Sequence, residues 1–234
     1  MTALLWIARH KWRVLLLTFV TLLVISPISR VFDDRDSVIT PIFTLIVALV
    51  ILGAAERREM LWLMLTLTLI WSGVGIATDG SGLFAGVSLL APVLFLFVLA
   101  AIFVLVVRWM MRAGHIDAEV LCAAICGYLL LGIFFAVLYS ILIAVRQMWF
   151  PHYPGAFVST TTSDFEPRDL LYFSYMTLTT TGYGDIVPRG SEVRMLAVLE
   201  AMIGLFYNTI IIARFVSLYG VRLRTADEDR DRKP

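Results

Sequence analysis

The chain has 234 residues, of which 60% are hydrophobic and 16% are charged, and its formal net charge is +1. A soluble domain of this length cannot bury so much apolar surface, whereas a membrane protein presents such surface to lipid. The nearly balanced charge provides no basic excess of the kind that nucleic-acid-binding proteins carry. We therefore expect a membrane protein that has no nucleic-acid partner.

Six segments are long and apolar enough to span a bilayer: residues 12–29, 38–54, 60–77, 83–107, 118–148 and 192–219. Backbone polar groups in lipid must be paired within the protein, which favours helices here. The alternating pattern of a membrane barrel is absent from the sequence. The predicted fold is an all-α membrane protein with six transmembrane helices.

Basic residues gather in the N-terminus, the second and fourth loops and the C-terminal tail, which share one side of the membrane if there are six spans. They are Arg9, Lys11, Arg13, Arg57, Arg58, Arg108, Arg112, Arg222, Arg224, Arg230, Arg232 and Lys233. Basic loops stay inside the cell, so both termini are predicted to be cytoplasmic. We expect a multi-pass protein of the plasma membrane, the inner membrane in a prokaryote, with membrane lipids, anionic ones included, at its cytoplasmic face.

One long loop, residues 149–191, lies on the external side in this topology. Its first part is rich in Pro, Ser and Thr. The segment 168–178 that follows is apolar but too short to span, and it leads into the polar, glycine-rich stretch TLTTTGYGDIVP at 177–188. A short apolar helix before such a stretch suggests a re-entrant element.

The glycine-rich stretch has features of an ion pathway. Irregular backbone at membrane depth is tolerated where protein buries it or where it lines a watery path. Gly182 and Gly184 permit positive φ angles, which allow successive carbonyls to point to one side. A ring of such strands would replace the hydration shell of an ion, and Thr180 adds a hydroxyl. Because one strand cannot encircle an ion, several chains are required.

Residues 180–185, TTGYGD, resemble the signature filter of tetrameric potassium channels, which is usually TVGYGD. The order of outer helix, turret, pore helix, filter and inner helix is also similar over about 118–219. Thr181 stands where valine is common in the family. The resemblance implies a homotetramer that conducts K⁺ passively, with a re-entrant pore helix and an extended selectivity filter between helices 5 and 6.

The resemblance also implies roles for individual residues. K⁺, the transported ion and the only cofactor expected, would be coordinated by the carbonyls of Thr180, Thr181, Gly182, Tyr183 and Gly184. Asp185 would sit just outside the filter and bond to an aromatic donor on the pore helix, here Tyr172. Met176 replaces a glutamate that braces the filter in some relatives.

On the inner helix, Gly204 lies where channels of this family often carry a hinge glycine, although close helix packing explains it equally well. Asn208 follows one turn later and forms a stripe with Ala201, Leu205 and Ile212. The resemblance implies that this stripe faces the cavity below the filter.

Glu200 lies within the predicted inner helix. An intramembrane carboxyl usually has a partner, and we expect Ser174 or a threonine of the pore helix.

The chain divides into a four-helix module at 1–114, a pore domain at 115–220 and a charged cytoplasmic tail at 221–234. Between 80 and 107 the sequence has no Lys or Arg, so the fourth span lacks the charges of a voltage sensor. The segment 108–119 is either an interfacial linker helix or a plain basic loop. The tail is too short to form a regulatory domain and is expected to be mobile.

Three alternatives to a selective potassium channel remain at this point: a poorly selective cation channel, a potassium transporter component and a non-conducting membrane scaffold. The intact Gly-Tyr-Gly argues against the first, and a single filter copy argues against a transporter with four repeats. An enzyme is not expected, because no nucleophile–base pair or metal cluster is evident in the sequence.

Overall fold

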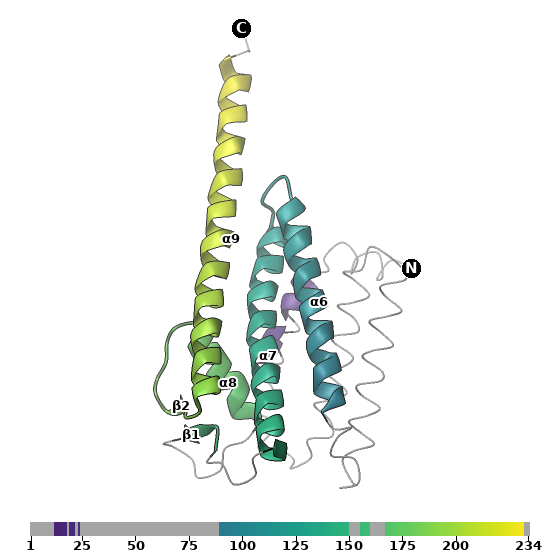
Figure 1. Cartoon of the computed structure of the whole chain (residues 1–234). Coiled ribbons are helices and arrows are strands. Elements are labelled where there is room, and N and C mark those ends of the chain that lie inside the picture. Colours follow the sequence, from purple (N-terminus) through teal and green to yellow (C-terminus); the bar gives the residue numbers. More distant parts are fainter. Residues whose placement is uncertain are drawn as a thin grey trace, which may run out of the picture.

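The computed structural model describes residues 12–17, 19–21, 23, 89–149, 155–159 and 167–231. Its elements are α6 (Leu90–Arg112), α7 (Ala118–Trp149), β1 (Phe157–Ser159), α8 (Pro167–Leu178), β2 (Ile186–Pro188) and α9 (Ser191–Asp231). A short apolar helical segment at Trp12–Thr21, purple in Figure 1, precedes them.

Three helices of the described part are long and apolar enough to cross a membrane: Pro92–Arg112, Ala118–Trp149 and Ser191–Tyr219. They correspond to the predicted spans 83–107, 118–148 and 192–219. The predicted spans 38–54 and 60–77 lie outside the described residues, and 12–29 is described only in part. The mostly helical architecture fits an all-α membrane protein.

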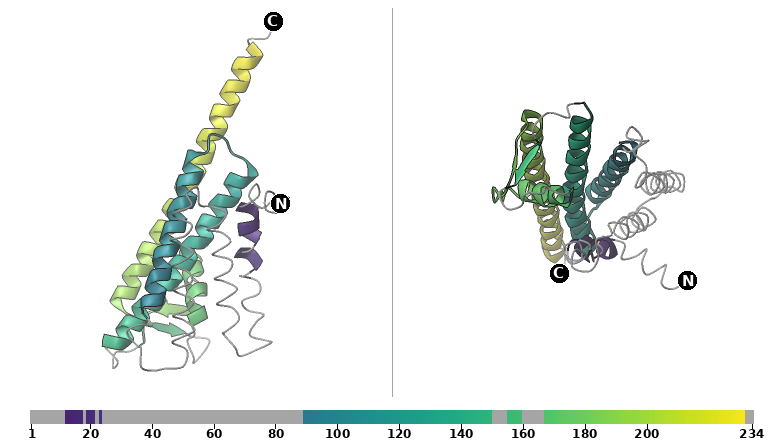
Figure 2. Two further views of the ribbon diagram at one scale, coloured as in Figure 1. Left: turned by 90° about the vertical axis from the view of Figure 1, so that its right-hand side faces the viewer. Right: turned by 90° about the horizontal axis from the view of Figure 1, so that it is seen from below.

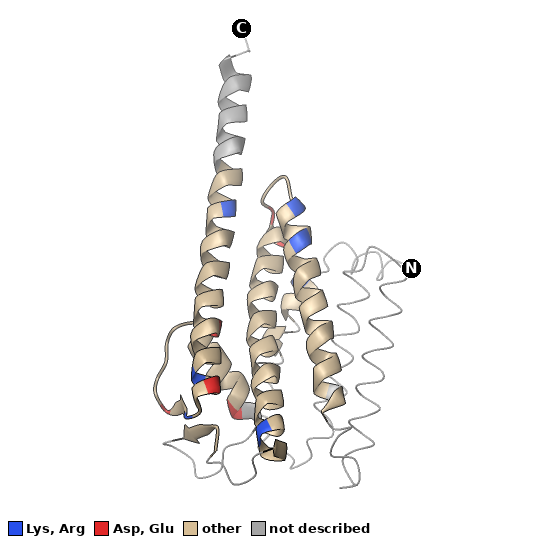
Figure 3. Ribbon diagram, in the orientation of Figure 1, with Lys and Arg blue, Asp and Glu red and all other residues tan. Residues whose placement is uncertain are grey.

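Helix α7 is the central element, because α6, α8 and α9 all pack against it. Helices α6 and α7 run antiparallel, α9 returns alongside α7, and the short α8 lies at an angle beside the lower halves of α7 and α9 (Figures 1 and 2). Charged residues gather near the ends of these helices and leave their middle parts largely uncharged (Figure 3). This distribution is typical of helices surrounded by lipid.

The buried side chains form two clusters, and α7 contributes to both. The first joins the N-terminal segment, α6 and α7 around residues such as Trp12, Leu99 and Cys126. The second joins α7, α8 and α9 around residues such as Phe135, Tyr139, Phe173, Leu178 and Tyr207. The second cluster fixes α8 between the two long helices.

The region 108–119 differs from both predicted alternatives. Residues 108–112 form the last turn of α6, residues 113–117 are a short connector, and α7 begins at Ala118. The Asp117 carboxylate accepts a hydrogen bond from the Val120 N–H at 2.9 Å. This cap satisfies a free amide at the start of α7, so the helix begins here and no separate linker helix forms.

The C-terminal end of α6 is held by α9. The Arg214 guanidinium donates to the Met111 and Ala113 carbonyls at 3.1 Å each. The last carbonyls of a helix lack helical partners and favour a nearby cation. Arg214 therefore links α9 to the end of α6 and to the connector between α6 and α7.

Helix α9 is longer than predicted. The sequence indicated a span ending near 219 and a mobile tail at 221–234, but the helix continues to Asp231. Residues 221–231 contain Arg, Leu, Ala and Glu, which are good helix formers, and no proline. Nothing in residues 221–231 stops a helix that has already started, and the domain boundary at 220 stays a prediction.

Strands β1 and β2 form a small antiparallel pair with Phe157 opposite Pro188, Val158 opposite Val187 and Ser159 opposite Ile186. The Arg189 N–H donates to the Ala156 carbonyl at 2.8 Å beside this pair. The pair joins the chain before α8 to the chain after residues 179–185. This pair was not expected from the sequence, since strands of three residues have no recognisable period.

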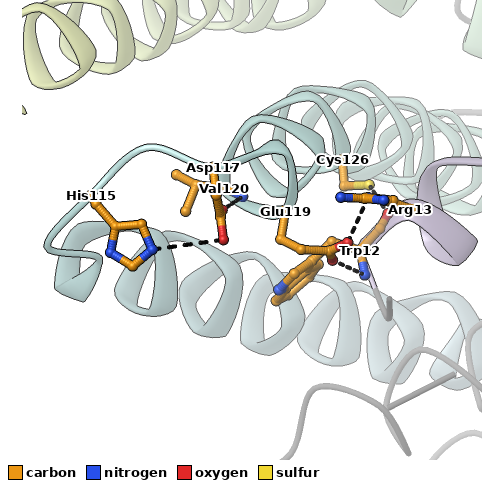
Figure 4. A network of polar contacts seen from close by, with 7 residues as sticks. All are labelled: Trp12, Arg13, His115, Asp117, Glu119, Val120 and Cys126. Atoms are coloured by element: carbon orange, nitrogen blue, oxygen red, sulfur yellow. Dashed lines mark hydrogen bonds and ion pairs between the residues drawn. The ribbon is translucent and has the colours of Figure 1, made fainter. Parts of the chain in front are cut away.

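The N-terminal segment is anchored to α7 through Glu119 (Figure 4). The Glu119 carboxylate pairs with Arg13 Nε at 2.8 Å and accepts from the Trp12 N–H at 3.3 Å. Trp12 also stacks near Trp109, with ring centroids 5.0 Å apart, and its carbonyl accepts from the Cys126 thiol at 3.8 Å. These contacts join the start of the chain to both α6 and α7.

We predict that Arg13→Ala and Glu119→Ala are coupled. Each should lower the free energy of unfolding in mixed micelles, and the double variant should lose less than the sum by ~1 kcal/mol, the range of a partly exposed ion pair. His115→Ala is the control, because its contact with Asp117 is 4.0 Å long and largely exposed. Additive losses in the cycle would show that the pair does not anchor the N-terminal segment.

Candidate functional site

Helix α8 begins at a proline and ends at the glycine-rich stretch. Pro167 occupies the first helical position, where its missing N–H costs nothing and its fixed φ suits a helix. Asp169 lies in the first turn, where a negative charge is favoured. The predicted short helix at 168–178 is therefore confirmed.

The C-terminal end of α8 is fully paired. A helix leaves its last four carbonyls without helical partners. Three of them accept from amides of the following segment: Tyr175 from Thr179 at 3.0 Å, Met176 from Thr181 and Gly182 at 3.0 and 3.1 Å, and Thr177 from Thr180 at 2.9 Å. The fourth, that of Leu178, accepts from the Tyr128 hydroxyl of α7 at 2.9 Å. The helix end and the segment after it thus form one bonded unit.

The segment after α8 has an alternating backbone. Thr180, Gly182 and Gly184 have φ angles of 58°, 50° and 78°, whereas Thr181 and Tyr183 do not have positive φ. Among the described residues, Thr180 is the one non-glycine residue with positive φ. A positive φ costs glycine little and is uncommon for threonine. The positive φ expected at both glycines is therefore present.

Residues 179–184 are exposed, and the Tyr183 side chain is 72% exposed. The Thr179 and Thr181 hydroxyls lie 2.9 Å apart within the segment. No other part of the described chain covers these residues, although the β1–β2 pair and α8 fix both of their ends. The segment is thus presented at the surface of the single chain.

Asp185 and Tyr172 are brought together as the sequence indicated. Their side chains form a hydrogen bond, which is the main cause of a raised pKa at the Tyr172 phenol. This contact joins the end of the exposed segment to the face of α8.

Gly204 of α9 lies against the end of α8. A Cβ atom at this position would stand 2.8 Å from both the Leu178 carbonyl oxygen and the Leu178 Cδ1 atom. The backbone of α9 therefore comes so close to the last residue of α8 that only glycine fits at position 204. Close packing explains this glycine directly, and the hinge role stays a prediction.

The stripe predicted on the inner helix lies on an open face of α9. Leu205 and Ile212 are 59% and 63% exposed, and Asn208 is also exposed. The Asn208 side chain hydrogen-bonds to the Tyr128 hydroxyl. Asn208 thus belongs to the group that holds the Leu178 carbonyl, and its expected place beside a cavity remains a prediction.

Tyrosine hydroxyls that cross between helices were missed from the sequence. Tyr128, Tyr175 and Tyr207 donate to the carbonyls of Leu178, Leu129 and Ala124 at 2.9, 2.8 and 2.7 Å. A tyrosine in an apolar helix usually needs a partner for its hydroxyl, which is a usable signal. The partner itself is a backbone group on another helix and leaves no mark in the sequence.

Residues 123–220 match the profile of a family described as ion channels. This region extends from α7 through α8 and the exposed segment into α9. The chain belongs to this ion-channel family, which implies a membrane protein rather than an enzyme.

Two curated relatives share the name Protein LctB. The protein from Geobacillus stearothermophilus is 39% identical over 90 residues, which are 38% of this chain and 63% of that protein. The protein from Bacillus caldotenax is 33% identical over 111 residues, which are 46% of this chain and 81% of that protein. The chain thus spans less than two thirds of the first relative's length and more than two thirds of the second's.

We predict that Gly204→Ala destabilises the junction of α8 and α9. The added methyl group meets the Leu178 backbone at 2.8 Å, so the two helices must separate, at a cost of about 1–3 kcal/mol. Thermal unfolding in detergent should occur at lower temperature, and the open probability in planar bilayers should change. Gly114→Ala is the control, since its Cβ would meet no atom within 4 Å. Equal behaviour of the two variants would rule out a close approach at Gly204.

Proposed function

We propose that four copies of this chain form a potassium-selective channel. K⁺ passes through a filter built from the carbonyls of Thr180, Thr181, Gly182, Tyr183 and Gly184. The observation that carries the proposal is the alternation in the sign of φ along this segment. The segment directly follows the end of α8, whose carbonyls it hydrogen-bonds. Carbonyls gathered on one side of each strand replace the water around a dehydrated ion.

Uncovered surfaces on α9 and on the filter segment favour assembly with further copies. Of the most apolar window of α9, 17% is buried, compared with 61% for α7. Tyr183 and the filter segment are likewise uncovered in one chain. A ring of four chains encloses the ion, covers part of α9 and braces Tyr183 from the side.

The orientation of α8 supports a cation pathway. The C-terminal end of a helix carries a partial negative charge, which favours a cation nearby. In the proposed tetramer the four ends of α8 point to a central cavity below the filter. Leu205, Asn208 and Ile212 of α9 line this cavity, and Gly204 acts as the hinge of its gate.

The membrane topology and the domain boundaries of the proposed channel are inferred from the sequence. Six spans with both termini in the cytoplasm set the filter near the external face of the plasma membrane. Residues 1–114 form the front module, residues 115–220 the pore domain, and residues 221–234 the cytoplasmic tail. The hydrogen bond between Tyr172 and Asp185 supports the outer end of the filter. Lipids with anionic headgroups meet the basic cytoplasmic segments.

We predict a reversal potential close to the potassium value when purified protein in planar bilayers separates potassium from sodium. Gly182→Ala should abolish the current without preventing membrane insertion, because a side chain at φ 50° is strained and crowds the ion path. Gly155→Ala is the control, since its Cβ would make an ordinary contact of 3.5 Å with the Phe157 carbonyl. A reversal potential near zero would indicate a poorly selective channel, and a monomer without current would indicate a scaffold.

We also predict that the channel has no intrinsic voltage sensor. Helix α6 carries Arg108 and Arg112 at its end and no other Lys or Arg. Each gating charge contributes ~2.3 kcal/mol per 100 mV, so a sensor would respond strongly over 200 mV. Open probability should change little over that range. A steep conductance–voltage curve in symmetric, blocker-free solutions would contradict this expectation.

A further inference from the structure

Three hydroxyl and carboxyl groups meet in the buried interior where α7, α8 and α9 join. The Tyr139 hydroxyl donates to Glu200 Oε2 at 2.7 Å, and Ser174 Oγ lies 2.5 Å from Glu200 Oε1. The Ser174 hydroxyl also lies 2.7 Å from the Gly132 carbonyl of α7. Ser174 is the partner that the sequence indicated for Glu200, whereas Tyr139 was not foreseen.

The surroundings of this group exclude water. Tyr139, Ser174 and Glu200 are all 0% exposed. The Tyr139 ring packs edge-on against Phe157 and Phe173, with centroids 5.7 and 5.3 Å apart. Within the described part of the chain no basic side chain pairs with Glu200, so an ionised carboxylate here would be buried without a counter-charge. Such burial is strongly unfavourable.

The hydrogen bonds at Ser174 show how many protons this group must hold. Ser174 has one hydroxyl proton but two oxygen neighbours, each within the 2.5–3.0 Å range of an O–H···O bond. The Gly132 carbonyl can only accept, so Ser174 must donate to it. A second proton is then needed between Ser174 Oγ and Glu200 Oε1. With Tyr139 donating to Oε2, the carboxyl oxygen Oε1 is the remaining place for that proton.

We infer that Glu200 is a protonated carboxylic acid that fastens α8 to both α7 and α9. Its Oε1–H donates to Ser174, which donates to Gly132, while its Oε2 accepts from Tyr139. All three protons and all three acceptors are then matched. A buried network in which every donor has an acceptor favours a single arrangement of the three helices.

Glu200 is thereby a positioning residue for the filter segment. Ser174 lies four residues before Leu178, one turn of α8, so the two residues share a face of the helix. The Glu200 bond fixes the rotation of α8 at one turn, and the Tyr128 bond to the Leu178 carbonyl fixes it at the next. Loss of the first bond should let the end of α8, and the backbone that follows, turn away from its bonded position.

Infrared difference spectroscopy of the purified full chain tests the proton directly and does not depend on the proposed function. Near neutral pH, the wild-type minus Glu200→Gln spectrum should contain the carbonyl band of a protonated carboxylic acid, shifted after exchange into deuterium oxide. Carboxylate stretching bands in its place would overturn the inference that Glu200 is neutral.

The positioning role rests on the proposed potassium channel and is tested by reversal potentials in the same bilayer experiment. Glutamine has an amide N–H₂ that donates to Ser174 and a carbonyl that accepts from Tyr139. Glu200→Gln should therefore keep the potassium reversal potential, whereas Glu200→Ala should shift it toward zero. If Glu200→Ala does not fold, Ser174→Ala provides the same loss at the α8 side and should shift it in the same direction.

Unchanged selectivity in whichever of these alanine variants folds would refute the positioning role. A wild-type protein without potassium selectivity would refute the proposed function instead, and the infrared band would still decide the protonation of Glu200.

Discussion

A helix that ends inside a protein leaves four carbonyls to be paired, and the end of α8 meets this requirement without water. Amides of Thr179 to Gly182 pair three of the carbonyls, and the Tyr128 hydroxyl pairs the fourth. The first half of the exposed segment is therefore shaped by its bonds to the helix before it. The positive φ of Thr180, unusual for a threonine, is the local consequence of this pairing.

The position of α8 depends in turn on the two long helices beside it. Tyr128 of α7 and Glu200 of α9 bond to it, Tyr139 of α7 bonds to Glu200, and Gly204 lets α9 approach its last residue. Arg214, further along α9, binds the connector before α7. In the proposed channel, a movement of α9 cannot leave the end of α8 undisturbed, which gives the inner helix a direct mechanical link to the filter.

Much of this arrangement could be predicted from the sequence because its causes are local. Long apolar runs predicted α6, α7 and α9, the short run 168–178 predicted α8, and the buried carboxyl of Glu200 indicated Ser174 as a partner. Of three features that were missed, two have causes elsewhere in the chain and the third has a local cause. The β1–β2 pair depends on α8 bringing its ends together, the hydroxyl of Tyr128 bonds to a distant carbonyl, and α9 continues beyond 219 because nothing stops it.

In the proposed channel, the carbonyls of Thr180 to Gly184 from four chains coordinate K⁺. A crystal structure of the purified protein with rubidium in place of potassium tests this most directly, because rubidium scatters anomalously and resembles potassium in size. We expect a column of anomalous peaks on a four-fold axis, each surrounded by carbonyl oxygens of these residues. A tetramer with no peaks along this segment, or an assembly in which the four segments do not face one another, would contradict it.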